Sequence, residues 1–335
     1  MDSNKFPPAT SVQGTLHYIP KNLCAFEPSK PLTRNANINT LLWVGGMFDT
    51  LHSVSYPFRI AESLPPTWSL VTASLSSAGH SWGVSSIAKD AEDMAKIIEY
   101  LKEKRPGGKV VIMGHSTGCQ DCMEYVVGKG HEKRASVDGI ILQAPVSDRE
   151  ALDHELPEAM RQEADQLATK MCRERRGNEC IPNRLTRPVF GRLAVTAKRW
   201  LDVSSPGPDH TGADDYFSSD HSVERLKGTF GQLTSKTPLL VLYSGNEESV
   251  SDSVDKEKLV ETWIGVVKSA GGVVAEGSGI VPGATHNLNG NPDEVVRDLV
   301  KRVVNYTETI SGTDAGPSRM TAGTGHTKSF VAGDW

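Results

Sequence analysis

The hydrophobic positions of the chain form short continuous runs that alternate with longer periodic stretches. Runs that are apolar throughout are typical of strands buried on both faces of a sheet, and five occur, at 40–44, 69–73, 110–113, 139–142 and 238–242. A weaker sixth run covers 273–281. Between runs, apolar residues recur every three or four positions, which predicts amphipathic helices. Strands that alternate with helices predict an α/β fold with a mostly parallel central sheet and helices on both faces.

The periodic stretches place the helices between and after these strands. Five apolar side chains share one face of a predicted helix over 85–104, and further helices are predicted directly after 110–113, near 259–267 and from Pro292 onward. Before the first buried run, residues 14–27 hold two short apolar runs around a Pro-Lys-Asn turn. That pattern predicts a hairpin at the edge of the sheet.

The stretch 146–236 interrupts the alternation. It contains a charged helical segment with one apolar stripe, followed by loops rich in proline and glycine; the stripe consists of Met160, Ala164, Leu167 and Met171. We interpret this stretch as a cap over the C-terminal edge of the sheet, where open α/β sheets bind ligands. The last residues, 311–335, are rich in Gly, Ser and Thr and are predicted to be disordered.

Composition narrows the function classes. The chain has 335 residues, 38% of them apolar and 23% charged, which indicates a globular protein with a sizeable core. A net charge of −5 gives no general attraction to nucleic acid or to an anionic membrane. No apolar run is long enough to span a bilayer, and the N-terminus has no secretory h-region. We therefore expect a cytoplasmic protein, without a nucleic-acid or membrane partner, whose five cysteines are reduced thiols.

One motif points to catalysis. Gly114-His115-Ser116-Thr117-Gly118 matches G-x-S-x-G and lies directly between a buried run and a helix. That context is the one in which a nucleophile elbow exposes its serine above the sheet. The two glycines leave room for strand and helix to approach, and the helix N-terminus favours a developing oxyanion. We predict Ser116 as a nucleophile.

A second match, Gly79-His80-Ser81-Trp82-Gly83, lies in a poorer context. Ser76-Ser77-Ala78 stands between it and the preceding apolar run, and Val84-Ser85-Ser86 delays the apolar positions of the next helix. It also follows the second strand of the central run, whereas an elbow normally follows the third. We favour Ser116 over Ser81.

A serine nucleophile needs a base and an orienting acid, and in this architecture the chain order is Ser, acid, His. The acid is expected just after a late strand, where Glu247 and Glu248 are both candidates, and spacing to Val250 favours Glu247. The base is expected in a loop before the last helix, and His286 lies in such a loop. We predict the triad Ser116, Glu247 and His286.

Backbone N–H groups should complete the reaction site. One oxyanion donor is expected from Thr117, directly after the nucleophile, and the other from Met47 in the glycine turn that follows the first central strand. In the same turn Gly46 lets the backbone approach a substrate. His80 and Trp82 lie near the predicted mouth and are candidates for substrate binding. This chemistry requires neither a cofactor nor a metal.

Two other sequence features suggest different functions. Cys119-Gln120-Asp121-Cys122 is a C-x-x-C one turn into a helix, as in thiol oxidoreductases. The serine already occupies the start of that helix, so we favour core packing for both thiols. Arg173, Arg175 and Arg176 in the cap could meet an anionic substrate, but a solvated face is favoured.

The chain also resembles a known family. Three segments carry the resemblance: the run 111–121 with Gln120-Asp121 behind the elbow, the run 81–86, and Gln143-Ala144-Pro145-Val146-Ser147-Asp148-Arg149-Glu150. They are similar to a fungal α/β-hydrolase family that includes fusarinine C esterase. The resemblance covers 14–310 as the hydrolase domain, with 146–236 as its cap insertion. It implies Ser116 as the nucleophile and His286 as the base.

The acid loop departs from the family pattern, because Glu247 stands where the family has aspartate and the following Tyr and Pro are absent. The resemblance implies hydrolysis of hydroxamate siderophore esters in intracellular iron release. Two alternatives stay open: a hydrolase of another fungal secondary-metabolite pathway, and a non-catalytic hydrolase-fold protein that binds a small molecule. The expected partner is a small-molecule ester, and the sequence leaves the oligomeric state open.

Overall fold

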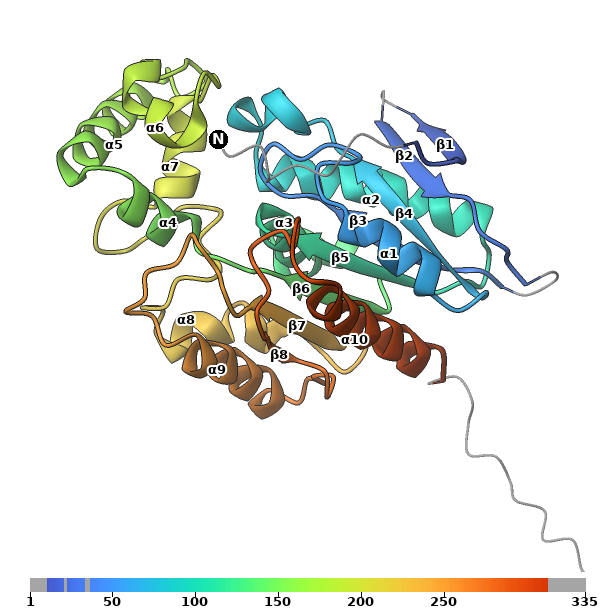
Figure 1. The fold of residues 1–335 in the computed structure, drawn as a ribbon. Coiled ribbons are helices and arrows are strands. Elements are labelled where there is room, and N and C mark those ends of the chain that lie inside the picture. Colours follow the sequence, from blue (N-terminus) through green and yellow to red (C-terminus); the bar gives the residue numbers. More distant parts are fainter. Residues whose placement is uncertain (1–10, 21–22, 34–36, 313–335) are drawn as a thin grey trace, which may run out of the picture.

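The computed structural model describes residues 11–20, 23–33 and 37–312. Its centre is an eight-stranded sheet with the order β1-β2-β4-β3-β5-β6-β7-β8 (Figure 1). The strands are β1 (Gly14–Ile19), β2 (Leu23–Pro28), β3 (Asn39–Val44), β4 (Trp68–Ser74), β5 (Val110–His115), β6 (Gly139–Gln143), β7 (Leu239–Ser244) and β8 (Gly279–Val281). All five buried runs are strands, so this part of the prediction is confirmed.

Strand pairing follows the predicted pattern. From β4 through β3 to β8 every neighbouring pair is parallel. The first two strands pair antiparallel with each other, and β2 pairs antiparallel with β4, so the predicted edge hairpin is confirmed. The weak sixth run contributes only the three residues of β8 and an isolated bridge at Val274.

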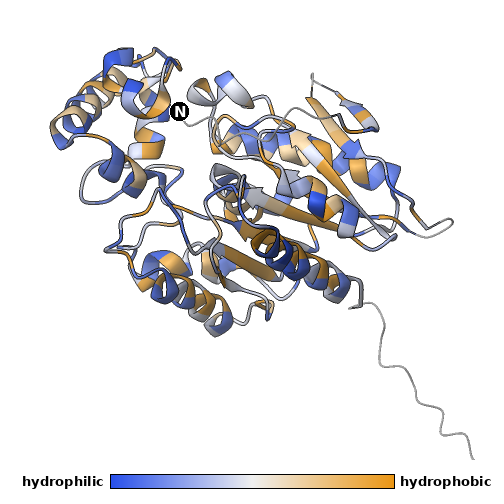
Figure 2. Cartoon of the chain, in the orientation of Figure 1, coloured by the Kyte–Doolittle hydropathy of each residue, from blue (hydrophilic) through white to orange (hydrophobic). Residues whose placement is uncertain are grey.

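Alternate side chains of the strands build two separate cores. Leu42 and Val44 face the helices α2 (Ile87–Lys104), α3 (Thr117–Val127) and α9 (Lys256–Ser269). On the opposite face Leu41 and Trp43 pack against α1 (Tyr56–Ser63) and α10 (Asp293–Gly312). Figure 2 shows the apolar strands between helices whose outer sides are hydrophilic. The mostly parallel α/β sheet with helices on both faces is therefore confirmed.

The helix α1 was not expected from the sequence. It has eight residues and begins with a proline in its first turn. Such a length is too short to display more than two turns of periodicity, and its stability comes from packing against α10.

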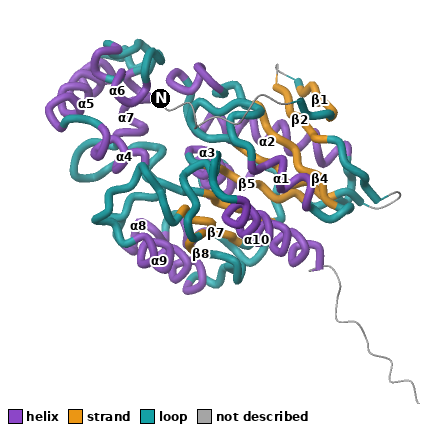
Figure 3. Tube along the Cα trace, in the orientation of Figure 1, coloured by secondary structure: helices purple, strands orange, loops and turns teal. Residues whose placement is uncertain are grey.

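The interrupted stretch forms helices outside the sheet (Figure 3). These are α4 (Asp148–Glu155), α5 (Glu158–Arg173), α6 (Arg187–Phe190) and α7 (Ala197–Ser204), which share an apolar cluster of their own. In the predicted stripe of α5, Ala164 and Met171 are buried, and Met160 and Leu167 pack against the same cluster. We call α4 to α7 the cap helices.

The second half of that stretch packs elsewhere. The helix α8 (Val223–Lys227) and the turn after it contact α9, and Phe217, Leu226 and Phe230 belong to the core of the main sheet. The apolar cluster of the cap helices ends at Val203. The predicted insertion 146–236 thus contains both a separate cap core and a segment that completes the main core.

The C-terminal helix extends slightly beyond the expected boundary. α10 includes Ser311 and Gly312, and Trp68 Nε1 donates a hydrogen bond to Ser311 Oγ at 2.7 Å. The rest of the expected tail, 313–335, lies outside the described residues. Within the described residues, none of the helices combines the length and the apolar character that a bilayer crossing needs.

Candidate active site

Ser116 lies in a sharp turn between β5 and α3. Its φ of 53° and ψ of −126° lie in a region that L-residues rarely adopt. Steric contacts explain both glycines of the motif: a Cβ on Gly114 would lie 2.2 Å from Gly118 O, and one on Gly118 would lie 2.4 Å from Val44 O. Both glycines are therefore needed because β5, α3 and β3 approach too closely to leave room for a Cβ atom.

The serine, the histidine and the glutamate form one hydrogen-bonded chain. Ser116 Oγ lies 2.8 Å from His286 Nε2, and His286 Nδ1 lies 2.8 Å from Glu247 Oε2. An ionised carboxylate only accepts hydrogen bonds, so Nδ1 donates to Glu247 and Nε2 is left to accept the serine proton. The three residues come from the elbow, the loop after β7 and the loop between β8 and α10.

The two neighbouring glutamates hold different atoms of the same histidine. Glu247 contacts the ring, whereas Glu248 Oε2 accepts the backbone N–H of His286 at 2.8 Å. Glu247 is 5% exposed and also accepts the backbone N–H of Ser249, while Glu248 lies at the surface. The structure thus separates the two candidate acids by geometry.

The charge around His286 favours its protonated form. Burial alone would lower the pKa of the imidazole, but the carboxylate of Glu247, its hydrogen bond and the charges of Glu248 and Asp49 raise the pKa above 6.5. A histidine with this environment accepts a proton readily at neutral pH. That property suits a general base.

Gln143, the last residue of β6, forms hydrogen bonds with three residues around the site. Its Oε1 accepts hydrogen bonds from His115 Nδ1 at 2.6 Å and from the hydroxyl of Tyr56 at 2.9 Å. Its Nε2 donates to the carbonyl of His286 at 3.2 Å. Burial and the nearby His286 lower the pKa of His115 to about 3, so the ring beside the site stays neutral.

The glycine turn after β3 lies against Ser116. Parallel pairing of Val44 with Gly114 brings the two loops together, and a Cβ on Gly46 would lie 2.6 Å from Ser116 Cβ. The N–H of Gly46 donates to Asp49 Oδ2 at 2.8 Å, so the turn is closed on itself. Burial raises the pKa of Asp49 to about 6, and the Gly46 hydrogen bond opposes that shift.

A pocket of about 230 Å³ opens beside the serine. Its lining includes Ser116, His286 and Met47, together with apolar side chains of the cap helices such as Leu152 and Phe190. These residues are far apart in the sequence, and the fold brings them together around the pocket. In the sheet, β4 lies on one side of β3, whereas β5 and the later strands lie on its other side. The direction in which strands are added therefore reverses between β3 and β5, and open α/β sheets bind ligands at such a reversal.

The predicted substrate residues His80 and Trp82 do not line this pocket. His80 is exposed in a short 3₁₀ turn, and Ser81 is exposed beside it. Trp82 is buried and packs against two residues that line the pocket. The centre of its ring lies 5.6 Å from that of Phe48 and 5.4 Å from that of Phe190. A direct contact of either residue with a substrate remains a prediction.

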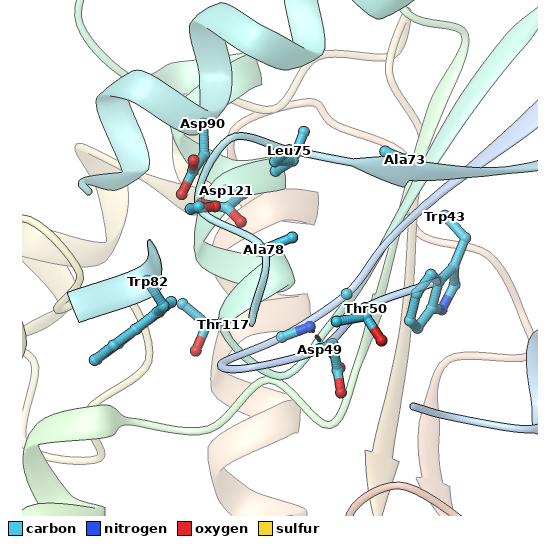
Figure 4. A pocket seen from close by; sticks show the side chains of 13 residues that line it. Trp43, Asp49, Thr50, Ala73, Leu75, Ala78, Trp82, Asp90, Thr117 and Asp121 are labelled. Carbon is cyan, nitrogen blue, oxygen red and sulfur yellow. Dashed lines mark hydrogen bonds between the residues drawn. The ribbon is translucent and has the colours of Figure 1, made fainter. Parts of the chain in front are cut away.

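Behind the elbow lies a small cavity of about 20 Å³, the size of one water molecule (Figure 4). The side chains of Asp90 and Asp121 lie close together there. Burial raises the pKa of Asp90 to about 6 and that of Asp121 well above its usual range. Thr117 Oγ1 and Trp82 Nε1, which belong to residues of the same lining, are buried without a hydrogen-bond partner in the described chain.

The thiols and arginines that suggested alternative functions are not among the described residues that line the pocket. Cys119 and Cys122 are fully buried, and burial raises the pKa of both thiols well above the usual range, which opposes thiolate chemistry. Arg176 is at the surface and pairs with Glu174 and Glu179. In the ranges 11–20, 23–33 and 37–312, no group of three or more His, Cys, Asp or Glu side chains is arranged to hold a metal ion.

Gln143 and Asp49 are site residues that the sequence reasoning missed. Each is a polar residue at or just beyond the carboxyl end of a buried strand, where parallel strands present their functional groups. That position was a usable signal for Gln143. Asp49 lies five residues beyond β3, and only the folded turn brings its carboxylate back to Gly46.

The sheet, the elbow and the loop order together define an α/β-hydrolase fold. Among solved structures, the chain is similar to the siderophore hydrolase EstB from Aspergillus fumigatus, with a TM-score of 0.78 and 33% identity over 90% of this chain and 99% of that one. A monoglyceride lipase variant from Saccharomyces cerevisiae shares the fold at 16% identity, with a TM-score of 0.58 over 90% of this chain and 97% of that one.

The chain belongs to the family described as "Protein of unknown function (DUF1749)", which matches residues 1–308. It is 34% identical over 347 residues to fusarinine C esterase sidJ of Aspergillus fumigatus, covering 90% of this chain and 98% of that protein. It is also 34% identical over 359 residues to an esterase of Emericella nidulans, covering 91% and 95%. The resemblance to the fungal family of fusarinine C esterase is thus confirmed.

Proposed function

We propose that this protein is a serine hydrolase of carboxylic esters, with Ser116 as nucleophile, His286 as general base and Glu247 as orienting acid. The observation that carries the proposal is the unbroken hydrogen-bond chain from Ser116 Oγ through the imidazole to Glu247. A serine held this way beside a pocket has the arrangement that acyl transfer needs.

In the first half-reaction Ser116 Oγ attacks the ester carbonyl carbon while His286 Nε2 takes the hydroxyl proton. The carbonyl oxygen becomes an oxyanion, for which the N–H groups of Thr117 and Met47 are the proposed donors. When the tetrahedral intermediate collapses, the C–O bond to the alcohol breaks and the imidazolium gives its proton to the leaving oxygen. The acyl group stays on Ser116.

In the second half-reaction a water molecule replaces the alcohol. His286 removes a proton from the water, the hydroxide attacks the acyl carbon, and collapse releases the acid and returns the proton to Ser116. Throughout, Glu247 keeps the proton on Nδ1 and stabilises the imidazolium. Gly46 supports this chemistry by its lack of a side chain, since any Cβ would occupy the space beside Ser116.

For the substrate we propose an ester of a hydroxamate siderophore of the fusarinine C type, and hence a role in iron release. Support comes from two relatives, one named as a fusarinine C esterase and the other as a siderophore hydrolase. Iron would arrive with the ligand as cargo. We propose that the exposed His80 contacts the substrate at the rim of the pocket, and that Trp82 supports Phe48 and Phe190, which line the pocket.

The glutamate that replaces the usual aspartate of the acid loop is the argument for a non-catalytic binding protein. Glutamate at this position still reaches Nδ1 of His286 at 2.8 Å, so the longer side chain provides no reason for inactivity. A hydrolase of another secondary-metabolite ester remains the alternative within the same chemistry, and the choice of substrate panel tests it.

A fluorophosphonate probe followed by peptide mapping tests the catalytic part, because it labels only an activated serine. We expect the label on Ser116, with labelling abolished in Ser116→Ala and preserved in Ser81→Ala. A label on Ser81, or no label on the folded protein, would overturn the proposal. Ferric and iron-free fusarinine-type esters, compared with other natural-product esters, then test the substrate class by kcat/KM.

A further inference from the structure

One face of α4 forms a wall of the pocket beside Ser116. Four of its residues line the pocket, spaced three, four and seven positions from the first, and they are Asp148, Ala151, Leu152 and Glu155. This spacing places them on one stripe of the helix. Most of the remaining lining is apolar, and no lysine or arginine is among the described lining residues.

Asp148 carries an unused hydrogen-bond acceptor in this wall. The residue is 7% exposed, and its Oδ2 accepts a hydrogen bond from Gln120 Nε2 at 3.0 Å. Its Oδ1 accepts none from the described residues, and the carboxylate forms no ion pair with them. This oxygen is not fully enclosed by the described residues, so it is open to a hydrogen-bond donor, and it belongs to a residue that lines the pocket.

The nearest buried cation does not neutralise Asp148 directly. Arg199 places Nη1 on both oxygens of Asp214, at 2.7 and 2.8 Å, and its guanidinium lies 4.2 Å from the ring centre of Trp82. Glu155, two helical turns beyond Asp148, is exposed at the pocket and forms no ion pair in the described chain. Two carboxyl groups therefore line the pocket, and no lysine or arginine among the described lining residues balances them when they are ionised.

We propose that the pocket selects esters that carry a protonated primary amine, and that Asp148 is the residue that determines this specificity. An ammonium group donates one hydrogen bond to Oδ1 of Asp148 and keeps the others for water, Glu155 or the substrate itself. The apolar lining receives the carbon chain between the amine and the ester. The inference rests on the proposed esterase function, since it names the substrate class of that same site.

The preference depends on pH with a defined sign. Burial and the charges of Asp214 and Asp215 raise the pKa of Asp148 to about 7, against Arg199 and His286, which lower it. The other titratable groups that face Asp148 are Cys119 and Asp121 on α3 and Glu155 on its own helix. Because an ammonium ion binds the ionised carboxylate, the preference grows as the pH rises through 7 and fades below it.

The test compares matched esters on the folded wild-type protein. p-Nitrophenyl esters of ω-amino acids are paired with p-nitrophenyl n-alkanoates of equal length, in which a methyl group replaces the ammonium. A second series carries the amine on the alcohol. The readout is the ratio of kcat/KM, ammonium over methyl, which cancels the titration of His286. We expect a ratio of roughly ten to one hundred in at least one series.

Three variants locate the effect. Asp148→Asn removes the charge with little change of shape, and we expect the ratio to fall to about one. Glu155→Gln, at the exposed end of the stripe, should lower the ratio about twofold to threefold. Asp153→Asn is the matched control: it makes the same change on the same helix, but Asp153 pairs with Arg161 and does not line the pocket, so the ratio should stay at the wild-type value.

Failure of this inference is distinguishable from failure of the esterase proposal. Hydrolysis of the methyl series with a ratio near one in both series would overturn amine selection and leave the esterase function standing. A high ratio that survives in Asp148→Asn would overturn the role of Asp148. If that variant does not fold, competitive inhibition of the wild type by n-hexylammonium but not by n-hexanol replaces it. No turnover in either series, with no serine labelling, would instead reject the esterase function.

Discussion

The elbow region and the cap region of this molecule bound the same pocket but are constructed by different rules. At the elbow, backbone approaches closer than a Cβ allows determine Gly46, Gly114 and Gly118, and three loops converge on Ser116. No glycine is among the described cap residues that line the pocket. The cap wall presents side chains from one stripe of α4 and an aromatic layer around Phe190. If the proposed function is correct, catalysis depends on the backbone of the main sheet, and substrate selectivity depends on side chains of the cap helices.

The largest effect should come from the nucleophile itself. Ser116→Ala should lower kcat by roughly 10⁴-fold or more, because the remaining groups can only bind the ester and stabilise the oxyanion. Steady-state hydrolysis of a simple p-nitrophenyl ester measures the loss. Substrate binding to the variant, followed by calorimetry, should persist. A variant that retained a tenth of the activity would place the nucleophile elsewhere.

The two glutamates of the acid loop offer the next comparison. Glu247→Gln should lower kcat by roughly 10³-fold or more, because the imidazole loses the charge that fixes its tautomer. Glu248→Gln should lower kcat by about tenfold at most, since Glu248 forms its hydrogen bond with the backbone N–H of His286 and not with the imidazole ring. Equal losses in both variants would contradict the separation of their roles.

The pH profile checks the same histidine independently. His286 must be neutral to accept the serine proton, and its pKa is raised above 6.5. For a neutral ester, kcat/KM should therefore rise with pH and reach half its maximum above 6.5. In Glu247→Gln the midpoint should move to lower pH, because the carboxylate no longer stabilises the imidazolium. A midpoint that stays in place would assign the titration to another group.

A steric change at the turn should have an intermediate effect. Gly46→Ala places a methyl group 2.6 Å from Ser116 Cβ, so we expect kcat to fall by about a hundredfold while the protein still folds. Gly265→Ala on α9 is the matched control, since a Cβ there meets no atom within 4 Å. The control should keep full activity and gain up to about 1 kcal/mol in the free energy of unfolding.

The smallest effect is expected in the cap. Phe190→Leu shortens a side chain that packs against Phe48, Trp82 and Trp200, and it should raise KM for long esters by about fivefold with little change in the rate of fluorophosphonate labelling. Initial rates over an ester length series measure this. A slower labelling rate would show that the cap helps to hold the elbow, which would weaken the contrast between the two regions.

The sequence carried most of the information about the elbow side. Apolar runs located the strands, and the position of G-x-S-x-G between a run and a helix singled out Ser116 over Ser81. Chain order then directed attention to the loops of Glu247 and His286. These features are readable because each depends on residues that are close in sequence or on a fixed order of elements.

The cap side was less readable for a physical reason. Which face of α4 borders the pocket depends on how the cap helices pack over the sheet, and local sequence does not encode that contact. Asp148 belongs to the segment 143–150 that carries the family resemblance, but only the folded structure shows that Gln120 occupies one of its oxygens and that the residue lines the pocket. His80 and Trp82 were assigned to the mouth from loop position alone, and the fold puts one at the surface and the other behind Phe48.

The backbone of Ser116 has a consequence for the thermodynamics of the whole protein. At a φ of 53° and a ψ of −126°, this residue holds a conformation that glycine tolerates far better than serine, at a cost of order 1–3 kcal/mol. Ser116→Gly should therefore raise the melting temperature while abolishing turnover, and Ser116→Ala should not raise it. The position that contributes most to reactivity would then be one where folding is locally opposed, and the surrounding contacts of β3, β5 and α3 provide the surplus that keeps it in place.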